Sequence, residues 1–295
     1  MSEKSDISKM SDTPLEPTPA FTDSLRHGTY KRVIACIADM HVGSRYGLCG
    51  PKWLGKESND LASARNAGQR KLFNHWEFFK KNCQKWKVDT VMLLGDLTNG
   101  YNRFEHGLQQ MTTDLDEQVD HAIDLLEPLC KDKIVFGVSG SGYHESSDTR
   151  IHKTITENLR GKYLGAIANI KLENTSRTLN ISHGVSAAFV YRTMLMSREA
   201  LFMMEAIQLG KLPKIDCIIR AHWHKFIYIH MEHIHLLQLP GWQAFVPWKG
   251  ALLSYGKMQP DIGGCILFVD QEDRILVLKF TMDGIPHIGD PLWEG

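Results

Sequence analysis

The sequence lacks the features that mark several classes of protein. It carries no net charge, because 34 Lys and Arg residues balance 34 Asp and Glu residues. A protein that coats nucleic acid usually has a strongly basic surface, so this balance disfavours such a coat but leaves a local basic groove open. No stretch approaches the ~20 apolar residues of a membrane span. The N-terminus also lacks the basic-then-apolar plan of a signal peptide.

The sequence has few cysteines, and their spacing is uninformative. The six residues are scattered and form no Cys-x-x-Cys pair. Three of them lie inside apolar runs, where Cys behaves as a small buried hydrophobe. The natural interpretation is a soluble protein of a reducing compartment, the cytoplasm.

Composition divides the chain into two unequal parts. Residues 1–27 are rich in Ser, Asp, Glu, Lys and Pro and hold few large apolar side chains. Such a composition cannot offset the entropy lost on ordering, so it predicts a disordered leader. We expect residues 28–295 to form a single domain, since a chain with 43% hydrophobic residues can bury a substantial core.

Continuous apolar runs, typical of strands covered on both faces, alternate with helical periodicity in the first half of the chain. Strands are expected at 33–38, 91–94 and 134–138, and helices at 61–85, 111–129 and 149–168. This order favours a largely parallel sheet. In the second half, strands are expected at 178–182, 217–221, 226–229, 233–239, 264–269 and 274–280, with a helix at 193–209. Their close succession predicts a second, more antiparallel sheet.

Carboxylates and imidazoles follow several of these strands. The candidate metal ligands are Asp39, His41, Asp96, His183, His222 and His224. Ligands at the C-terminal ends of several strands are typical of an active site on the rim of an α/β sheet. Carboxylate and imidazole without thiolate suit Mn²⁺, Fe or Zn²⁺ in a hydrolytic site. A carboxylate such as Asp96 has two oxygens and can bridge two ions.

Five short blocks resemble, in order, the motifs of the calcineurin-like metallophosphoesterases, which are DxH, GDxx, GNH[D/E], H and GHxH. The matching residues are Asp39-x-His41, Gly95-Asp96, a glycine before His144-Glu145, His183-Gly184 and His222-x-His224. The resemblance covers about residues 33–224. It implies a four-layer α/β/β/α sandwich of two mixed sheets flanked by helices, with a dinuclear metal site between the sheets.

The resemblance also implies how the ligands divide. One ion would be held by Asp39, His41, Asp96 and His224, and the other by Asp96, His183 and His222. The two cofactors are expected to be divalent ions, with Mn favoured and Fe, Zn or Mg as alternatives.

The chain departs from the family pattern at three places. The Asn ligand before the general-acid histidine is missing from the run Ser139 to Glu145, so Ser141 or a water would complete the second ion's coordination. Ala221 replaces the glycine of the last block. The residues around Asp96 and His144 do not resemble those of the protein Ser/Thr phosphatases. They look closer to the phosphodiesterase and nuclease-like branches, and to small metallophosphoesterases of phage genomes, which would place the protein in a host cytoplasm.

The chemistry implied is attack on phosphorus by a hydroxide that two cations make available near neutral pH. His144 would protonate the leaving oxygen, because an imidazole with an ordinary pKa of about 6.5 can supply a proton at neutral pH. Glu145 would orient His144.

Other side chains near these motifs are candidates for substrate contact. They are Arg45, Tyr46, Asn99, Tyr143, Arg150 and Trp223. Trp242 and Trp248 could stack a base, although packing is the more common use of tryptophan. The remaining histidines lack a motif around them and are assigned to structure, as are His75 and His121 on the expected helices.

The sequence therefore favours a phosphodiesterase acting on nucleic acid or a nucleotide, with no membrane partner. Two alternatives stay open: a phosphomonoesterase acting on a small molecule or phosphoprotein, and an interaction module that kept the fold but lost the second metal.

Overall fold

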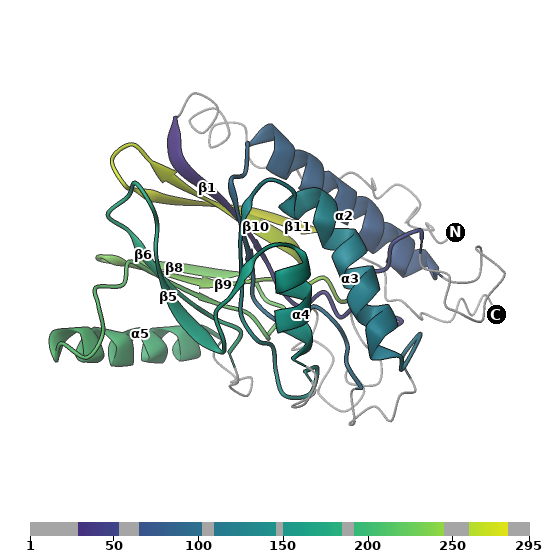
Figure 1. Ribbon diagram of the computed structural model, residues 1–295. Helices are drawn as coiled ribbons and strands as arrows, with labels where there is room; N and C mark the ends of the chain where they lie inside the picture. Colours follow the sequence, from purple (N-terminus) through teal and green to yellow (C-terminus); the bar gives the residue numbers. More distant parts are fainter. Residues whose placement is uncertain are drawn as a thin grey trace, which may run out of the picture.

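The structure, a computed structural model, describes residues 29–52, 65–101, 109–145, 150–184, 192–244 and 260–282. The expected leader lies outside these residues. The described residues form two mixed sheets that face each other, with helices on the outer face of each (Figure 1). The four-layer α/β/β/α arrangement is therefore confirmed.

The first sheet has the strand order β11-β10-β1-β2-β3-β4. Its strands are β1 (Tyr30–Ile37), β2 (Thr90–Leu93), β3 (Ile134–Gly137), β4 (Lys162–Tyr163), β10 (Ile262–Asp270) and β11 (Ile275–Met282). The four strands from β1 to β4 are parallel, as the alternation of strands and helices predicts. β10 and β11 add to the free edge of β1 in antiparallel fashion.

The second sheet has the order β5-β6-β7-β9-β8. Its strands are β5 (Ile167–Lys171), β6 (Thr178–Ser182), β7 (Cys217–Arg220), β8 (Ile227–Met231) and β9 (Ile234–Gln238). The three central strands are parallel, and the two edge strands pair antiparallel. The carboxyl ends of β6 and β7 therefore lie at the same edge of the sheet.

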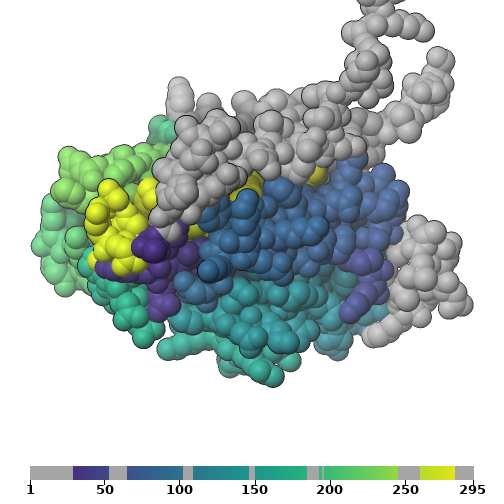
Figure 2. All heavy atoms as spheres, turned by 90° about the horizontal axis from the view of Figure 1, so that it is seen from above, coloured from purple at the N-terminus to yellow at the C-terminus, as the bar shows by residue number. Residues whose placement is uncertain are grey.

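Helices cover both outer faces. α2 (Ala67–Lys85), α3 (Leu115–Cys130) and α4 (Ile151–Asn158) lie on the first sheet, and α5 (Arg192–Gln208) lies on the second. Figure 2 shows α2 in blue and α3 in teal lying side by side across one surface. Three apolar clusters fill the three spaces between the layers. Their burial is the main term that holds the layers together.

The last two strands do not belong to the second sheet, contrary to the expectation from their position in the chain. All nine residues of β10 are buried, so this strand needs cover on both faces. It obtains that cover beside β1, under α2 on one side and facing the second sheet on the other. Gly264 makes the fit with α2 close, because a Cβ there would lie 2.9 Å from Cζ of Phe79.

The helix expected at 149–168 is also wrong in its length. α4 ends at Asn158, and the segment that follows forms β4 and β5. Arg160 and Gly165 have φ angles of 58° and 80°, which lie in the left-handed region and break a helix. A smaller shift affects α3, which begins after Asp114 because that side chain caps the helix by accepting from the N–H groups of Asp116 and Glu117.

All six cysteines are buried and free of disulfide bonds. Among the residues that the structure describes, none of the helices combines the length and apolar character needed to cross a membrane.

Two buried histidines, His75 on α2 and His121 on α3, should make the fold sensitive to acid. Burial lowers the pKa of His75 to about 4, and burial with the nearby charge of Arg65 lowers that of His121 to about 3. An unfolded histidine has a pKa of about 6.5, so below that pH the unfolded chain binds protons that the folded chain excludes. The contribution of these two histidines to the free energy of unfolding should therefore be largest above about pH 6.5 and fall as the pH drops towards about 4.

The contribution of one such histidine can be isolated. His75 packs against Phe78 and Trp242, so His75→Phe keeps an aromatic ring while removing the titrating group. We expect the slope of unfolding free energy against pH, measured by urea titration between pH 6 and 4.5, to decrease by up to about 1.4 kcal/mol per pH unit. An unchanged slope would show that His75 is accessible to protons in the folded protein.

Candidate metal centre

The six candidate ligands follow four strands that end at one edge of the two sheets. Asp39 and His41 follow β1, Asp96 follows β2, His183 follows β6, and His222 and His224 follow β7. The backbone ties these loops together: the Asp39 N–H donates to the carbonyl of Gly95, and the His41 N–H donates to that of Asp96. The ends of strands from both sheets therefore build one site.

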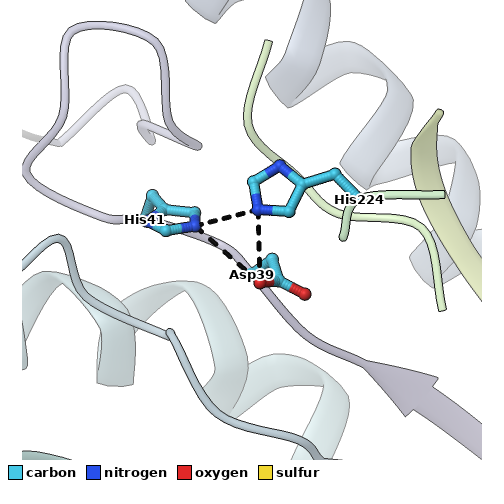
Figure 3. Close-up of side chains that lie close together, drawn as sticks. All are labelled: Asp39, His41 and His224. Atoms are coloured by element: carbon cyan, nitrogen blue, oxygen red, sulfur yellow. Dashed lines mark hydrogen bonds and ion pairs between the residues drawn. The ribbon is translucent and has the colours of Figure 1, made fainter. Parts of the chain in front are cut away.

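One group of three consists of Asp39, His41 and His224, whose side chains point toward one another (Figure 3). Nε2 of His41 lies 3.1 Å from Nε2 of His224. Oδ1 of Asp39 lies 3.2 Å from Nε2 of His224 and 3.8 Å from Nε2 of His41. Asp39 and His41 are fully or almost fully buried. Their ligand atoms are close enough together to share one cation.

A second group consists of Asp96, His183 and His222. Nε2 of His183 lies 2.9 Å from Oδ2 of Asp96 and 3.2 Å from Nδ1 of His222. The same Nε2 atom lies 3.8 Å from Oδ1 of Asp39. Asp39 therefore lies near both groups. Like Asp96, it is a candidate for a carboxylate that binds both cations.

His144 lies where the two groups meet. Its ring packs edge-to-face against His41 with 4.4 Å between centroids, and its ligand atom lies close to those of His41 and Asp96. Nδ1 of His144 lies 2.7 Å from the carbonyl oxygen of Asn99. Because a carbonyl can only accept, Nδ1 carries a proton and donates it, which leaves Nε2 as the nitrogen that can exchange a proton.

The expectation that Glu145 orients His144 needs correction. The carbonyl of Asn99 occupies Nδ1 of His144, and Oε1 of Glu145 instead lies 3.4 Å from Nδ1 of His152. Nε2 of His152 accepts a hydrogen bond of 3.1 Å from the N–H of Leu97. His152 therefore holds the loop that carries Asp96, and Glu145 lies beside His152 rather than beside the ring of His144.

Ser141, which stands near the position of the missing Asn, binds Asp96 directly. Its N–H donates to Oδ1 over 2.8 Å, and its hydroxyl lies 3.0 Å from Oδ2 and 3.2 Å from Oδ1. These bonds fix the orientation of the carboxylate. Whether Ser141 also binds a cation stays a proposal.

The backbone is strained at five of the six candidate ligands. The φ angles are 53° at Asp39, 44° at His41, 48° at Asp96, 79° at His222 and 50° at His224. A non-glycine residue in this region costs on the order of 1–3 kcal/mol and is concentrated at functional sites. Positive φ also explains how Asp39 and His41, so close in sequence, both turn towards one point after β1 has ended.

Two glycines that carried no assigned role in the sequence allow the ligands to approach. A Cβ on Gly140 would lie 2.2 Å from Oδ1 of Asp96, and one on Gly241 would lie 2.9 Å from Cγ of His224. In the sequence, only the two glycines on either side of Ser141 indicate this close approach. Gly241 also precedes Trp242, which is fully buried against Trp76 and Phe79 and therefore packs in the core. Trp248 lies outside the described residues.

The charges of the second group depend on one another. Burial opposes ionisation of Asp96, but the charges of His183 and His144 hold the pKa of that carboxyl well below its usual range. Burial alone would lower the pKa of His183, yet Asp96 and Asp39 raise it to about 9. Burial and the charge of His183 lower the pKa of His222. Two buried carboxylates thus attract positive charge, which here comes from imidazolium and in a metal complex would come from the cation.

The residues expected to contact the substrate differ widely in how exposed they are. Asn99 is completely buried, and neither polar atom of its carboxamide has a hydrogen-bond partner in the described structure. Tyr143 is 56% exposed, Arg45 and Arg150 are exposed, and Tyr46 and Trp223 are half-buried. A buried amide without a hydrogen-bond partner lowers stability by about 1–3 kcal/mol. Among these residues, Asn99 is therefore the one that a bound ligand would stabilise most.

The donor set fits divalent cations. Oδ1 of Asp39 is buried without a hydrogen-bond partner among the described residues, although three imidazoles lie within reach of it. Each group of three offers one carboxylate and two imidazoles, the combination that Zn²⁺, Mn²⁺ and Fe accept.

Comparison with known proteins gave the following results. No protein-family model matches the chain, and no curated protein matches it. Among solved structures, the chain is similar to a dimetal phosphatase from Danio rerio, with 11% identity and a TM-score of 0.46 over 85% of this chain and 100% of the other. It is also similar to an archaeal phosphodiesterase, with 14% identity and a TM-score of 0.40 over 83% of this chain and 99% of the other. Vps29 of Entamoeba histolytica in complex with zinc gives 14% identity and a TM-score of 0.40 over 85% of this chain and 99% of the other.

Proposed function

We propose that this protein is a metal-dependent phosphoesterase of the calcineurin-like kind, and that it hydrolyses a phosphodiester in nucleic acid or a nucleotide. The observation that carries the proposal is the meeting of two carboxylate–imidazole groups at one edge, with His144 at their junction. The five motif blocks come from separate parts of the chain, and a purely structural role gives no reason for them to converge.

Asp39, His41 and His224 would hold one cation, and Asp96, His183 and His222 the other. Asp96, or Asp39 through Oδ1, would be shared between them. When bound, two divalent cations supply an activated water and accept the charge that develops on the phosphoryl oxygens. We favour Mn²⁺, with Fe, Zn²⁺ or Mg²⁺ as alternatives, because the ligands are oxygen and nitrogen atoms only.

The chain's own residues would complete the site. His144, held at Nδ1 by the Asn99 carbonyl, would present a protonated Nε2 to the leaving oxygen. Ser141 keeps the Asp96 carboxylate in a fixed orientation. The unpaired carboxamide of Asn99 would be satisfied by a phosphoryl oxygen or by a cation. Arg45, Arg150 and Tyr143 are exposed and would contact the rest of the substrate, as would Tyr46 and Trp223.

The test begins with protein stripped of metal by a chelator. Mn²⁺, Zn²⁺, Fe²⁺ or Mg²⁺ is returned singly, and hydrolysis of bis-p-nitrophenyl phosphate is compared with that of p-nitrophenyl phosphate. We expect activity to depend on added metal, to favour the diester, and to accompany about two bound ions per chain.

Preference for the monoester would contradict the diester assignment and favour the phosphomonoesterase alternative. Binding of fewer than two ions, with no hydrolysis of either ester, would favour the interaction module instead. A panel of single-stranded DNA, duplex DNA, RNA and cyclic nucleotides would then identify the natural class of diester.

A further inference from the structure

α5 has two apolar faces, and only one of them is covered by other residues that the structure describes. The face towards the second sheet places Met196, Ala200, Met203 and Ile207 on Ile218 and Leu236. Its members are spaced three and four residues apart, as one stripe of a helix requires. Glu199 also faces the sheet, where its carboxylate pairs with Arg220. This face accounts for the docking of the helix on its own protein.

The opposite face of α5 is apolar and exposed to solvent. Met194 is 49% exposed, Leu201 63%, Phe202 62% and Leu209 61%. Leu209 follows the last helical residue but continues the helical hydrogen bonding, since its N–H donates to the carbonyl of Glu205. A surface helix normally carries polar residues on its outer side, and several large apolar residues exposed on one face usually mark a site of contact. These four residues, with Arg198 and Glu205 between them, are called the outer stripe.

The outer stripe is symmetric about its own centre. The midpoint lies between Leu201 and Phe202, Arg198 and Glu205 are equally far from it, and so are Met194 and Leu209. An antiparallel pair of helices related by a two-fold axis brings residues at equal and opposite heights together. In such a pair every apolar residue of the stripe would meet an apolar residue, and each positive charge would meet a negative one.

We propose that the outer stripe is a dimer interface, and that its occupant is α5 of a second copy of this chain in antiparallel orientation. Leu201 packs against Phe202 of the partner subunit at the centre. Arg198 pairs with the partner's Glu205 on either side, and Met194 meets the partner's Leu209 at the ends. The charge pattern selects this arrangement, because a parallel pair in register would place like charges opposite each other.

The size of the stripe sets the strength of the dimer. α5 has 17 residues and is therefore about 25 Å long. A single pair of helices of this length falls below the ~1,200 Å² of total buried surface that separates transient contacts from standard interfaces. The dimer should therefore be weak and reversible, with a dissociation constant in the micromolar range.

Sedimentation velocity across a micromolar concentration series tests the proposal directly. Wild-type protein should shift from monomer to dimer with rising concentration, and the double variant L201E/F202E should remain monomeric at every concentration. Lys211→Glu changes an exposed charge beyond the stripe and should dimerise like the wild type. A wild type that stays monomeric throughout the series would overturn the proposal.

Charge exchange tests the orientation. Arg198→Glu and Glu205→Arg should each raise the dissociation constant about tenfold or more, since each places like charges opposite one another at both ends of the interface. The double variant R198E/E205R restores opposite charges and should return the constant to within about threefold of the wild type. Failure of the double variant to recover, while both single variants weaken the dimer, would contradict the antiparallel pairing. Far-ultraviolet circular dichroism confirms that each variant is folded. Mass is the readout, so this result does not depend on the proposed hydrolase activity.

Discussion

Asp96→Asn is expected to remove nearly all metal-dependent phosphoesterase activity and at least one bound ion per chain. Asp96 lies in two of the three groups that can hold a cation, with His183 and His222 and with His41 and His144. The substitution keeps the shape of the side chain but removes its negative charge, so the neighbouring imidazoles lose their counter-ion. Substitution of a residue that only supports a metal ligand already lowers metal affinity or activity by about 10–100-fold. We therefore expect kcat/KM to fall by at least about a hundredfold, measured with the preferred diester and metal.

Asp216→Asn is the matched control for this experiment. Asp216 is also a buried aspartate at 1% exposure, but it lies just before β7 and pairs with Arg177 and the N–H of Thr178. Asp216→Asn should lower stability, because the half-buried guanidinium of Arg177 loses its ion pair with the buried carboxylate, while metal content stays at the wild-type value. Retention of full activity in Asp96→Asn would remove this carboxylate from the proposed site. Equal loss of metal in both variants would point to a general effect of disrupting a buried aspartate.

His144→Asn should lower kcat by about 10²–10⁴-fold, the usual contribution of a positioned general acid, with metal content unchanged. The loss should be largest for substrates with an alkoxide leaving group. It should be smaller for p-nitrophenyl esters, whose leaving group needs less help from a proton. Kinetics on both kinds of ester, together with metal analysis, measure the effect.

His183→Asn provides the contrast, because His183 contacts Asp96 and lies near His222 and should be needed for metal binding. If His144→Asn also loses metal, then His144 is itself a ligand, as its closeness to His41 and Asp96 permits. If the loss of activity is the same for good and poor leaving groups, the general-acid role is wrong and His144 acts in another way.

The convergence of the candidate ligands could be predicted because it follows from local patterns. Apolar runs locate the strand ends, and parallel strands bring their carboxyl ends to one edge. These patterns predict that Asp39, Asp96, His183 and His222 lie near one another, and the structure brings them together. The sheet that receives β10 could not be predicted in the same way, because its pairing with β1 joins distant parts of the chain.

The details of the site that escaped prediction depend on the backbone. The group that orients His144 is the backbone carbonyl of Asn99. Because every residue has a backbone carbonyl, the sequence gives no sign of which one binds His144. The left-handed angles at His41 and Asp96 likewise could not be predicted, because such angles are uncommon at any non-glycine residue, even though Asp and His adopt them more often than most. Gly140 could be seen in the sequence as a glycine, but its closeness to Asp96 became evident only when the loops after β2 and β3 lay side by side.

The pairing of β1 with β10 affects the nascent chain during synthesis on the ribosome. Cys36 and Cys265 are partners in that ladder although roughly 230 residues separate them. At a synthesis rate of about 5–20 residues per second, β1 would wait about 10 to 50 s for its neighbour to emerge. During that interval one row of amide groups on an apolar strand stays open to other nascent chains. Co-production of a chaperone that binds extended segments should therefore raise the yield of soluble protein.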